Sequence, residues 1–446
     1  MRQAVPIGCM VAGLALAGST APSPSALAEA APRLGRTAAW ASNPCAGLVA
    51  DVDPNIRGDV NGITSPRFMR RLWIKDRYLL GLFQQGGLGG RYLALYRLGP
   101  GDDPRNWHFV GDVAGSVAGD EFLSGDGFLT DRGHLVLVVS SRQQPFVADV
   151  KVFRYEYHGG GDWQLDVRSP VTVAPSSEEV RRFHATIAKD SLGRLFVAYV
   201  TSSAGAYAVR YAYSVTGGAD WVEAAKEFTA NDPYDHKSSR VSAVSVAGSD
   251  AIAIVFYDQD ASGEYLRWDY RLDSVPQPED GWTFAADAGA RQIARMPDVP
   301  FPDMHRHWSV ARDASGGLHV SYEGRARIFY SGYDGNALGS WAAPVLLGDG
   351  TYSSISASVG GAASFIYVFS DTAADTIVAR AYDPLAGAWT DRRQIGAGGR
   401  GVHRRVSSPE QFTGGPGSQL TVVFQNDLEP PGPATQNLFS VLRDCR

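Results

Sequence analysis

The chain has 446 residues and a formal net charge of −6. This acidic balance disfavours nucleic acid or an anionic membrane surface as a partner. The length suits one large domain better than two independent ones.

The first residues have the pattern of a secretory signal. Arg2 supplies a short basic start, residues 4–18 form an apolar core too short to span a bilayer, and residues 26–28 (Ala-Leu-Ala) form a small-x-small cleavage site. Too few residues precede Cys9 for a lipoprotein signal. We therefore expect residues 1–28 to be a signal peptide of a secreted protein, extracellular or periplasmic, without membrane insertion. Residues 29–58 follow as an N-terminal segment, and residues 59–446 as the main domain.

Two stretches of the chain repeat one pattern. Residues 184–199 and 307–322 both fit H-x-[ST]-[IV]-A-x-D-x-x-G-x-L-x-V-x-Y, and the copies lie 123 residues apart. A tryptophan recurs about every 60 residues, at Trp107, Trp163, Trp221, Trp282, Trp341 and Trp389. Such a period, with alternating apolar runs after Asp-x-x-Gly turns, is typical of a β-propeller with one four-stranded blade per unit. We expect an all-β fold with almost no helix.

The units divide the domain into seven segments, the last of which is short: 60–118, 119–178, 179–234, 235–302, 303–350, 351–400 and 401–446. Seven blades close if the N-terminal segment supplies the missing strand, and six blades with a trailing strand remain otherwise; we favour seven. The first and last strands then meet, so we expect Cys45 and Cys445 to form a disulfide that closes the ring of a monomer. The alternative is two unpaired thiols.

Basic residues recur where the innermost strands are expected to begin. They are Arg67, Arg182, His184, His236, Arg240, His305, His307 and Arg405. In a propeller these points converge at one mouth of the central channel. A basic mouth would bind an anion such as an acidic oligo- or polysaccharide, with arginine making bidentate contacts. The alternative is that these side chains are solvated, or paired with carboxylates of neighbouring blades.

The following strands end on the same face, because antiparallel neighbours run in opposite directions. Those ends carry Tyr257-Asp258 and Tyr322-Glu323, which become catalytic candidates together with His184 and His307. The tyrosines fit a core position equally well. Asp190 and Asp313 are expected to be turn residues, and the tryptophans are expected to pack between blades.

Residues 214–221 (Ser-Val-Thr-Gly-Gly-Ala-Asp-Trp) resemble the Asp-box, or bacterial neuraminidase repeat, S-x-D-x-G-x-x-W, with Thr216 in place of the aspartate. Residues 67–80 are similar to the opening of the sialidases, R-I-P-x-L-x-x-x-x-D-G-x-L-L. This resemblance implies a propeller that binds an anionic sugar, with Arg67 as the first arginine of the carboxylate-binding triad. The acid/base aspartate and the Tyr-Glu nucleophile pair of that family have no clear counterpart.

The repeated frame itself resembles the propellers of the ulvan and related uronate-polysaccharide lyases, over about 40 residues. In that group a histidine, a tyrosine and an arginine act on a uronic acid. The resemblance implies such roles for His184, His307, Tyr257, Tyr322 and Arg240, although the second histidine of the group's pattern is absent.

Three functions remain open. A sialidase-like glycoside hydrolase would need a carboxyl or tyrosine nucleophile beside an acid, for which Glu323 with Tyr322, or Asp258 with Tyr257, are the candidates. A polysaccharide lyase would need arginine on the uronate and histidine or tyrosine as the base. A non-catalytic glycan- or protein-binding propeller needs neither. We favour the hydrolase, with no cofactor and no metal at the site; a structural calcium ion remains open.

Overall fold

The structure is a computed structural model. It describes residues 51–52, 69–87, 90–100, 102, 106–117, 123–141, 149–229, 233, 237–260, 263–283, 292–295, 307–335, 341–359, 365–374, 376–384, 386–396, 402–413, 420, 422–427 and 438–440. Several predictions fall outside these residues: the signal peptide, the disulfide between Cys45 and Cys445, and the roles of Arg67, His236 and His305. Contacts within the chain group Asn43–Arg446 into one compact unit.

The described strands form seven sheets in chain order, with four to six strands each. The first four sheets are β2 (Leu72–Lys75), β3 (Tyr78–Gly87), β4 (Gly90–Leu98) and β5 (His108–Val117); β6 (Ser124–Leu129), β7 (Leu135–Ser140), β8 (Val150–Gly159), β9 (Asp162–Leu165) and β10 (Val171–Ala174); β11 (Val180–Lys189), β12 (Leu195–Ser203), β13 (Ala206–Ser214) and β14 (Val222–Glu227); and β15 (Ser238–Val246), β16 (Ser249–Asp260), β17 (Gly263–Leu272) and β18 (Gln292–Arg295).

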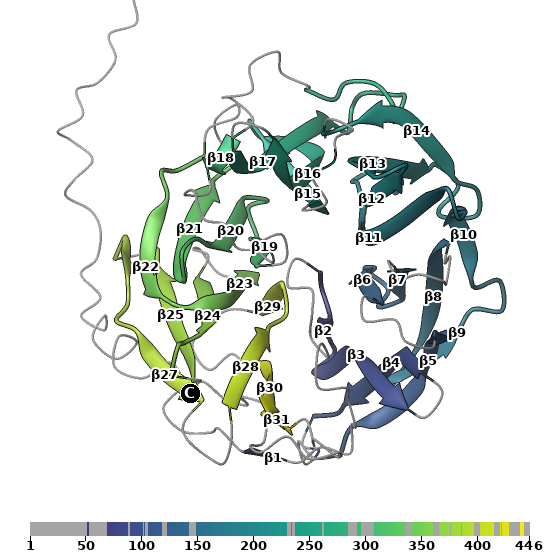
Figure 1. Cartoon of the computed structure of the whole chain (residues 1–446). Coiled ribbons are helices and arrows are strands. Elements are labelled where there is room, and N and C mark those ends of the chain that lie inside the picture. Colours follow the sequence, from purple (N-terminus) through teal and green to yellow (C-terminus); the bar gives the residue numbers. More distant parts are fainter. Residues whose placement is uncertain are drawn as a thin grey trace, which may run out of the picture. The chain divides into compact units, whose positions relative to one another are not determined.

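The other three sheets complete the ring (Figure 1). They are β19 (Trp308–Arg312), β20 (Leu318–Glu323), β21 (Arg327–Tyr333) and β22 (Val345–Asp349); β23 (Thr351–Val359), β24 (Ile366–Asp371), β25 (Ile377–Asp383), β26 (Ala388–Trp389), β27 (Arg393–Gly396) and β29 (Gln411–Thr413); and β28 (Val402–Ser407), β30 (Val423–Asp427), β31 (Leu438–Ser440) and β1 (Asp51–Val52). The predicted all-β propeller is confirmed.

The N-terminal strand closes the last sheet. Asp51 and Val52 of β1 pair antiparallel with Ser440 and Phe439 of β31. The short last unit therefore obtains its fourth strand from the other end of the chain, as the seven-blade interpretation of the sequence requires.

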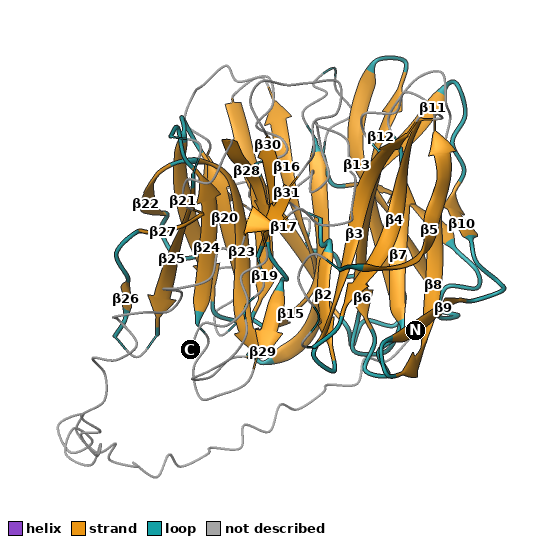
Figure 2. Cartoon of the chain, turned by 90° about the horizontal axis from the view of Figure 1, so that it is seen from below, coloured by secondary structure: helices purple, strands orange, loops and turns teal. Residues whose placement is uncertain are grey.

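The innermost strands are β2, β6, β11, β15, β19, β23 and β28, and from β2 to β28 each contacts the innermost strand of the next sheet. Figure 2 shows the strands running between two faces of the ring. The innermost strands β15 and β19 begin at the same level, since the indole Nε1 of Trp308, at the start of β19, donates to Ser238 Oγ, at the start of β15, over 2.9 Å. We call the face where these strands begin the N-terminal face, and the opposite one the C-terminal face.

The core lies between consecutive sheets, where the periodic tryptophans pack. Trp163 is buried between the first and second sheets, Trp221 packs between the second and third, and Trp341 between the fourth and fifth. Apolar residues cover both faces of central strands such as β12, whose first seven residues are all buried. This is the role that the sequence predicted for these tryptophans.

The repeated Asp-x-x-Gly segments are tight turns. Asp190 Oδ1 accepts from the backbone N–H groups of Leu192 and Arg194, and Asp313 Oδ1 accepts in the same way from Ser315 and Gly317. Both aspartates are therefore turn residues, as expected. Within the described ranges, no helix has the length and apolar character to cross a membrane.

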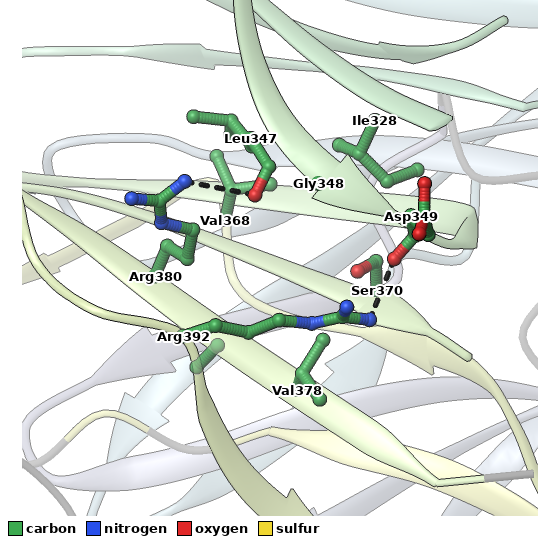
Figure 3. A pocket seen from close by; sticks show the side chains of 10 residues that line it. Ile328, Leu347, Gly348, Asp349, Val368, Ser370, Val378, Arg380 and Arg392 are labelled. Carbon is green, nitrogen blue, oxygen red and sulfur yellow. Dashed lines mark hydrogen bonds between the residues drawn. The ribbon is translucent and has the colours of Figure 1, made fainter. Parts of the chain in front are cut away.

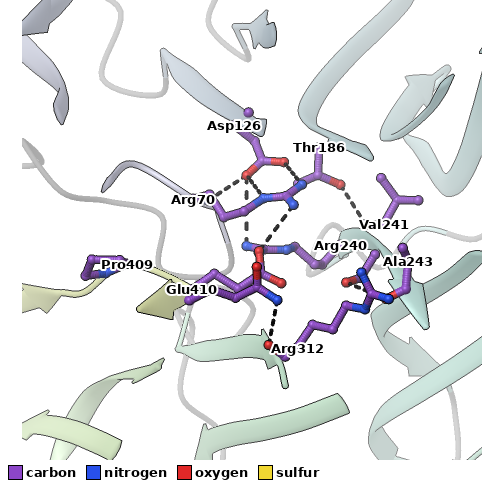
Figure 4. A network of polar contacts seen from close by, with 12 residues as sticks. Arg70, Asp126, Thr186, Arg240, Val241, Ala243, Arg312, Pro409 and Glu410 are labelled. Atoms are coloured by element: carbon purple, nitrogen blue, oxygen red, sulfur yellow. Dashed lines mark hydrogen bonds and ion pairs between the residues drawn. The ribbon is translucent and has the colours of Figure 1, made fainter. Parts of the chain in front are cut away.

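One strand departs from the predicted division into units. β29 belongs to the last unit in sequence but pairs in parallel with β23 of the sixth sheet, with Ala357 opposite Gln411. Its approach is held by two hydrogen bonds, from Ala357 N–H to Glu410 O at 2.9 Å and from Ser356 Oγ to Pro409 O at 2.5 Å. The detour places β29 on the inner side of the ring (Figure 1) and Glu410 beside Arg70 and Arg240 (Figure 4).

Candidate functional site

Two of the predicted catalytic residues meet on the N-terminal face. His307 directly precedes β19, and Glu323 ends β20, so antiparallel pairing places them side by side. The Glu323 N–H donates to the carbonyl of His307 at 3.0 Å, and Glu323 Oε2 lies 2.6 Å from Nδ1 of His307. The side chains are 11% and 8% exposed, so the pair is largely shielded from water.

A third residue, which the sequence did not indicate, completes this group. The ring centroid of Tyr352 lies 4.2 Å from that of His307, and its N–H donates to Glu323 Oε2 at 3.3 Å. Tyr352 has a φ of 50°, which is unfavourable for a bulky residue. Strain of this kind is concentrated at functional sites. We call His307, Glu323 and Tyr352 the mouth cluster.

The repeat places His184 at the position equivalent to His307, but its surroundings differ. His184 is 1% exposed and has a φ of 54°, at an irregularity in the pairing of β11 with β12. The position equivalent to Glu323 is Val200, which is buried. The second repeat therefore has a carboxylate at this position of the pattern, and the first has an apolar side chain.

Asp258 and Tyr257 lie in the fourth sheet and do not belong to the mouth cluster. The Asp258 carboxylate is paired with two cations, Lys237 Nζ at 2.8 Å and Arg267 Nη1 at 2.5 Å. Tyr257 is fully buried, and burial, together with the nearby Glu264 carboxylate, raises the pKa of its hydroxyl. Tyr322 also lies in the core, stacked on Phe329. Burial raises the pKa of the Tyr322 hydroxyl.

The predicted basic residues do not all gather at one place. Arg182 is paired with Glu223 of β14 at 2.9 Å and also donates to the carbonyl of Pro175, so it lies between the second and third sheets. Arg405 belongs to β28, and its side chain is outside the described part. Of the predicted basic residues whose side chains the structure describes, Arg240 is the one that reaches the centre of the ring.

There Arg240 joins a buried ionic group, drawn in Figure 4. Its Nη2 lies 2.6 Å from Glu410 Oε2, and Arg70 bridges the two carboxylates, with Nη1 3.2 Å from Glu410 Oε2 and Nη2 3.0 Å from Asp126 Oδ2. Asp126 also accepts the N–H of Ile187 at 2.9 Å. We call Arg70, Asp126, Arg240 and Glu410 the central network. It contains two positive and two negative charges, so it is not a basic funnel.

Burial alone would raise the pKa of Asp126, but Arg70 and Arg240 outweigh it and hold this pKa below its usual range. The carboxylate is therefore ionised, and the network is a set of matched charges. Such an arrangement binds the units of the ring together but presents no unmatched charge to an anion.

A small pocket between the fifth and sixth sheets carries no chemistry (Figure 3). Its volume of about 10 Å³ holds at most one water molecule. Its two arginines are engaged with backbone carbonyls: Arg380 Nη1 donates to Leu347 O at 2.8 Å, and Arg392 Nη2 to Asp349 O at 2.5 Å. Among the described residues, no group of three or more His, Cys, Asp or Glu side chains is arranged to hold a metal ion.

No family model matches the chain, and no curated protein matches it. Solved structures with a similar course of the chain include AofleA from Arthrobotrys oligospora (15% identity, TM-score 0.47, covering 76% of this chain and 89% of that one). An α-L-arabinanase from Penicillium chrysogenum, complexed with arabinobiose, has 14% identity and a TM-score of 0.46, with 73% and 94% covered. The six-bladed fungal lectin of Aleuria aurantia has 13% identity and a TM-score of 0.41, with 68% and 88% covered. At these TM-scores and identities the likenesses carry no argument about function.

Proposed function

We propose that the protein is a secreted carbohydrate-active enzyme that cleaves an acidic polysaccharide by β-elimination at the mouth cluster. The observation that carries the proposal is the 2.6 Å contact between His307 Nδ1 and Glu323 Oε2. A carboxylate on Nδ1 retains the proton there and leaves the lone pair on Nε2, which makes the imidazole a general base.

In this mechanism Nε2 of His307 removes the proton on the carbon next to the uronate carboxylate. The electron pair of that C–H bond forms the new C=C bond, and the C–O bond to the leaving sugar breaks. The Tyr352 hydroxyl donates its proton to the departing oxygen and is reprotonated from solvent afterwards. Arg325, on the turn directly after Glu323, is the candidate cation for the uronate carboxylate.

The hydrolase alternative is less well supported. A retaining or inverting glycosidase needs two carboxyl groups, or a tyrosine nucleophile, on either side of the scissile bond. Asp258 is neutralised by Lys237 and Arg267, and both Tyr257 and Tyr322 are buried in the core. In the mouth cluster the single carboxylate, Glu323, is engaged by His307 Nδ1 and by the backbone N–H of Tyr352. A carboxylate that orients a histidine base suits elimination better than the nucleophile and acid pair of a glycosidase.

The test is to incubate the protein with uronate-rich and sialylated polysaccharides, following both the ultraviolet absorbance of an unsaturated product and new reducing ends. Elimination raises both signals on the uronate substrate. Reducing ends without the absorbance would establish hydrolysis instead, and neither signal on any substrate would indicate a binding protein.

The matched variants are His307→Gln and His319→Gln. His319 also has a carboxylate partner, Asp313 Oδ2 at 3.0 Å, but it lies at the start of β20, away from the mouth cluster. We expect His307→Gln to lower kcat on the order of 100-fold or more, the usual contribution of a general base, and His319→Gln to retain it. Equal losses would contradict the assignment.

A further inference from the structure

A second pocket lies on the C-terminal face, remote in the fold from the mouth cluster. It has a volume of about 220 Å³ and is bordered by the ends of β6 and β23, by β2 and by β29. Its wall includes the aromatic residues Trp73, Phe128 and Phe412, and its polar lining includes Arg70 and Glu410 of the central network. Arg70 and Glu410 thus connect the pocket with the central network, whose contacts are drawn in Figure 4.

The Glu410 carboxylate lines the pocket while it is held by the central network. Its side chain is only 10% exposed, and Oε2 accepts from both Arg70 and Arg240. These two contacts fix the position of the carboxylate. A ligand hydroxyl that reaches it from the pocket would donate a charge-assisted hydrogen bond.

The charges of the network argue against a charged ligand. Arg70 and Arg240 already match Asp126 and Glu410, so a bound anion or cation would leave a shielded charge without a partner. A neutral ligand with several hydroxyl groups fits this end of the pocket. The Gln411 side-chain amide, which donates to Arg312 O at 2.8 Å, borders the same space.

The aromatic residues in the wall and the volume of the pocket indicate which kind of neutral ligand fits. The Trp73 indole is fixed by its hydrogen bond to Gly127 O at 3.1 Å, and Phe128 is partly exposed beside it. Rings of this kind pack against the apolar C–H face of a sugar. Pockets for drug-sized ligands usually have about 300–1,000 Å³, so the smaller space here suits one sugar ring. We propose that this pocket binds a single neutral monosaccharide unit, separately from the acidic glycan at the mouth.

The test is saturation-transfer NMR and calorimetry with D-glucose, D-galactose and D-mannose as probes, and with D-glucuronate and D-glucosamine as charged comparisons. We expect at least one neutral sugar to bind, with the strongest transfer to the C–H protons of one ring face. Better binding of a charged sugar, or binding of none of the five, would overturn the proposal.

Two variants locate the bound sugar. Val359→Trp fills the pocket from the end of β23, and Phe128→Leu removes an aromatic wall while keeping most of the apolar volume. We expect each to weaken binding by at least about tenfold, equivalent to about 1.4 kcal/mol. Val345→Trp, on the outer strand β22 where Val345 is 40% exposed, is the control and retains binding.

The variant His307→Gln distinguishes sugar binding in this pocket from binding at the mouth cluster. The variant loses turnover if the proposed function is right, and it still binds the neutral sugar if the present proposal is right. Loss of sugar binding in His307→Gln, with retention in both Val359→Trp and Phe128→Leu, would place the sugar at the mouth and refute the second pocket.

Discussion

At the scale of single residues, the central network explains how the ring is held at its axis. Arg70 precedes the first sheet, Asp126 belongs to the second, Arg240 to the fourth, and Glu410 lies within the last unit in sequence, directly before β29. Each of the four side chains is at most 10% exposed. Four segments far apart in the chain therefore meet through one group of buried charges, in which the loss of any member leaves the others unmatched.

We predict that Asp126→Asn is strongly destabilising. It leaves Arg70 and Arg240 with a single carboxylate, and breaking a buried ion pair costs about 3–5 kcal/mol. Asp131→Asn is the control, because Asp131 is 99% exposed and its pair with Lys189 spans 3.5 Å, a kind of contact worth about 1 kcal/mol or less. Urea unfolding of both variants measures the difference. Similar free energies of unfolding would show that the network contributes little.

Tyr352→Phe tests the proposed proton donor of the mouth cluster. The substitution keeps the ring beside His307 and the N–H that bonds Glu323, and removes only the hydroxyl. We expect kcat to fall on the order of 100-fold, with little change in KM or in melting temperature. An unchanged kcat would leave Tyr352 with a packing role only.

His307 and Glu323 could be found from the sequence, because one stands in the repeat and the other at a strand end defined by that repeat. Tyr352 could not be found in this way, since the sixth unit has no basic residue at the corresponding place. Glu410 was also missed. It depends on the course of the segment before β29, and nothing in the local pattern indicates that this segment crosses to a neighbouring sheet.

At the scale of elements, the repeated Asp-x-x-Gly frame and the tryptophan spacing were sufficient to predict an all-β ring and its division into units. Apart from β29, which joins the sixth sheet, the strands of each predicted unit form one sheet, because they pair with their neighbours in sequence; β1 completes the last sheet. The contacts between neighbouring sheets could not be predicted from the sequence pattern. The carbonyl oxygen of Gly316, for example, accepts a hydrogen bond from the Ser245 N–H at 2.9 Å, which connects the turn of the fifth sheet to the fourth sheet.

Replacing the equivalent glycines by alanine should separate turn strain from contact between sheets. Gly193 and Gly316 both have a φ of 86°, but a Cβ at Gly193 would meet nothing within 4 Å, whereas at Gly316 it would lie 2.8 Å from Ser245 Cβ and 3.0 Å from Ser245 N. Gly193→Ala should therefore cost about 1–2 kcal/mol from its backbone conformation alone. Gly316→Ala should cost clearly more. Equal losses of stability in thermal unfolding would contradict the tight contact between the two sheets.

At the scale of the whole molecule, the repeated units in the sequence are sufficient to predict the ring. They are not sufficient to predict how charges are distributed over it. The sequence predicted that basic residues would line one mouth. In the structure Arg182 is engaged with Glu223, and Arg240 is matched within the central network. Their partners come from an outer strand and from a remote unit, and such pairings depend on the assembled ring.

The assembled ring should lose stability in acid through carboxylates whose pKa values folding lowers. Burial alone would raise the pKa of Asp313, but hydrogen bonds from His319 and Ser315 lower it to about 2. A lowered native-state pKa means that this stabilisation is complete above the unfolded-state value near 4 and disappears as the pH falls toward 2; it amounts to about 2 kcal/mol. Asp126, whose pKa is also lowered, changes stability in the same direction.

Melting temperatures measured from neutral pH down to about pH 2 test this expectation. Asp313→Asn should lower the melting temperature at neutral pH and flatten its decline below about pH 4, because the substituted side chain has no proton to take up. Asp131→Asn, at an exposed position, should reproduce the profile of the unchanged protein. A decline in Asp313→Asn as steep as in the unchanged protein would show that carboxylates elsewhere in the ring control its acid stability.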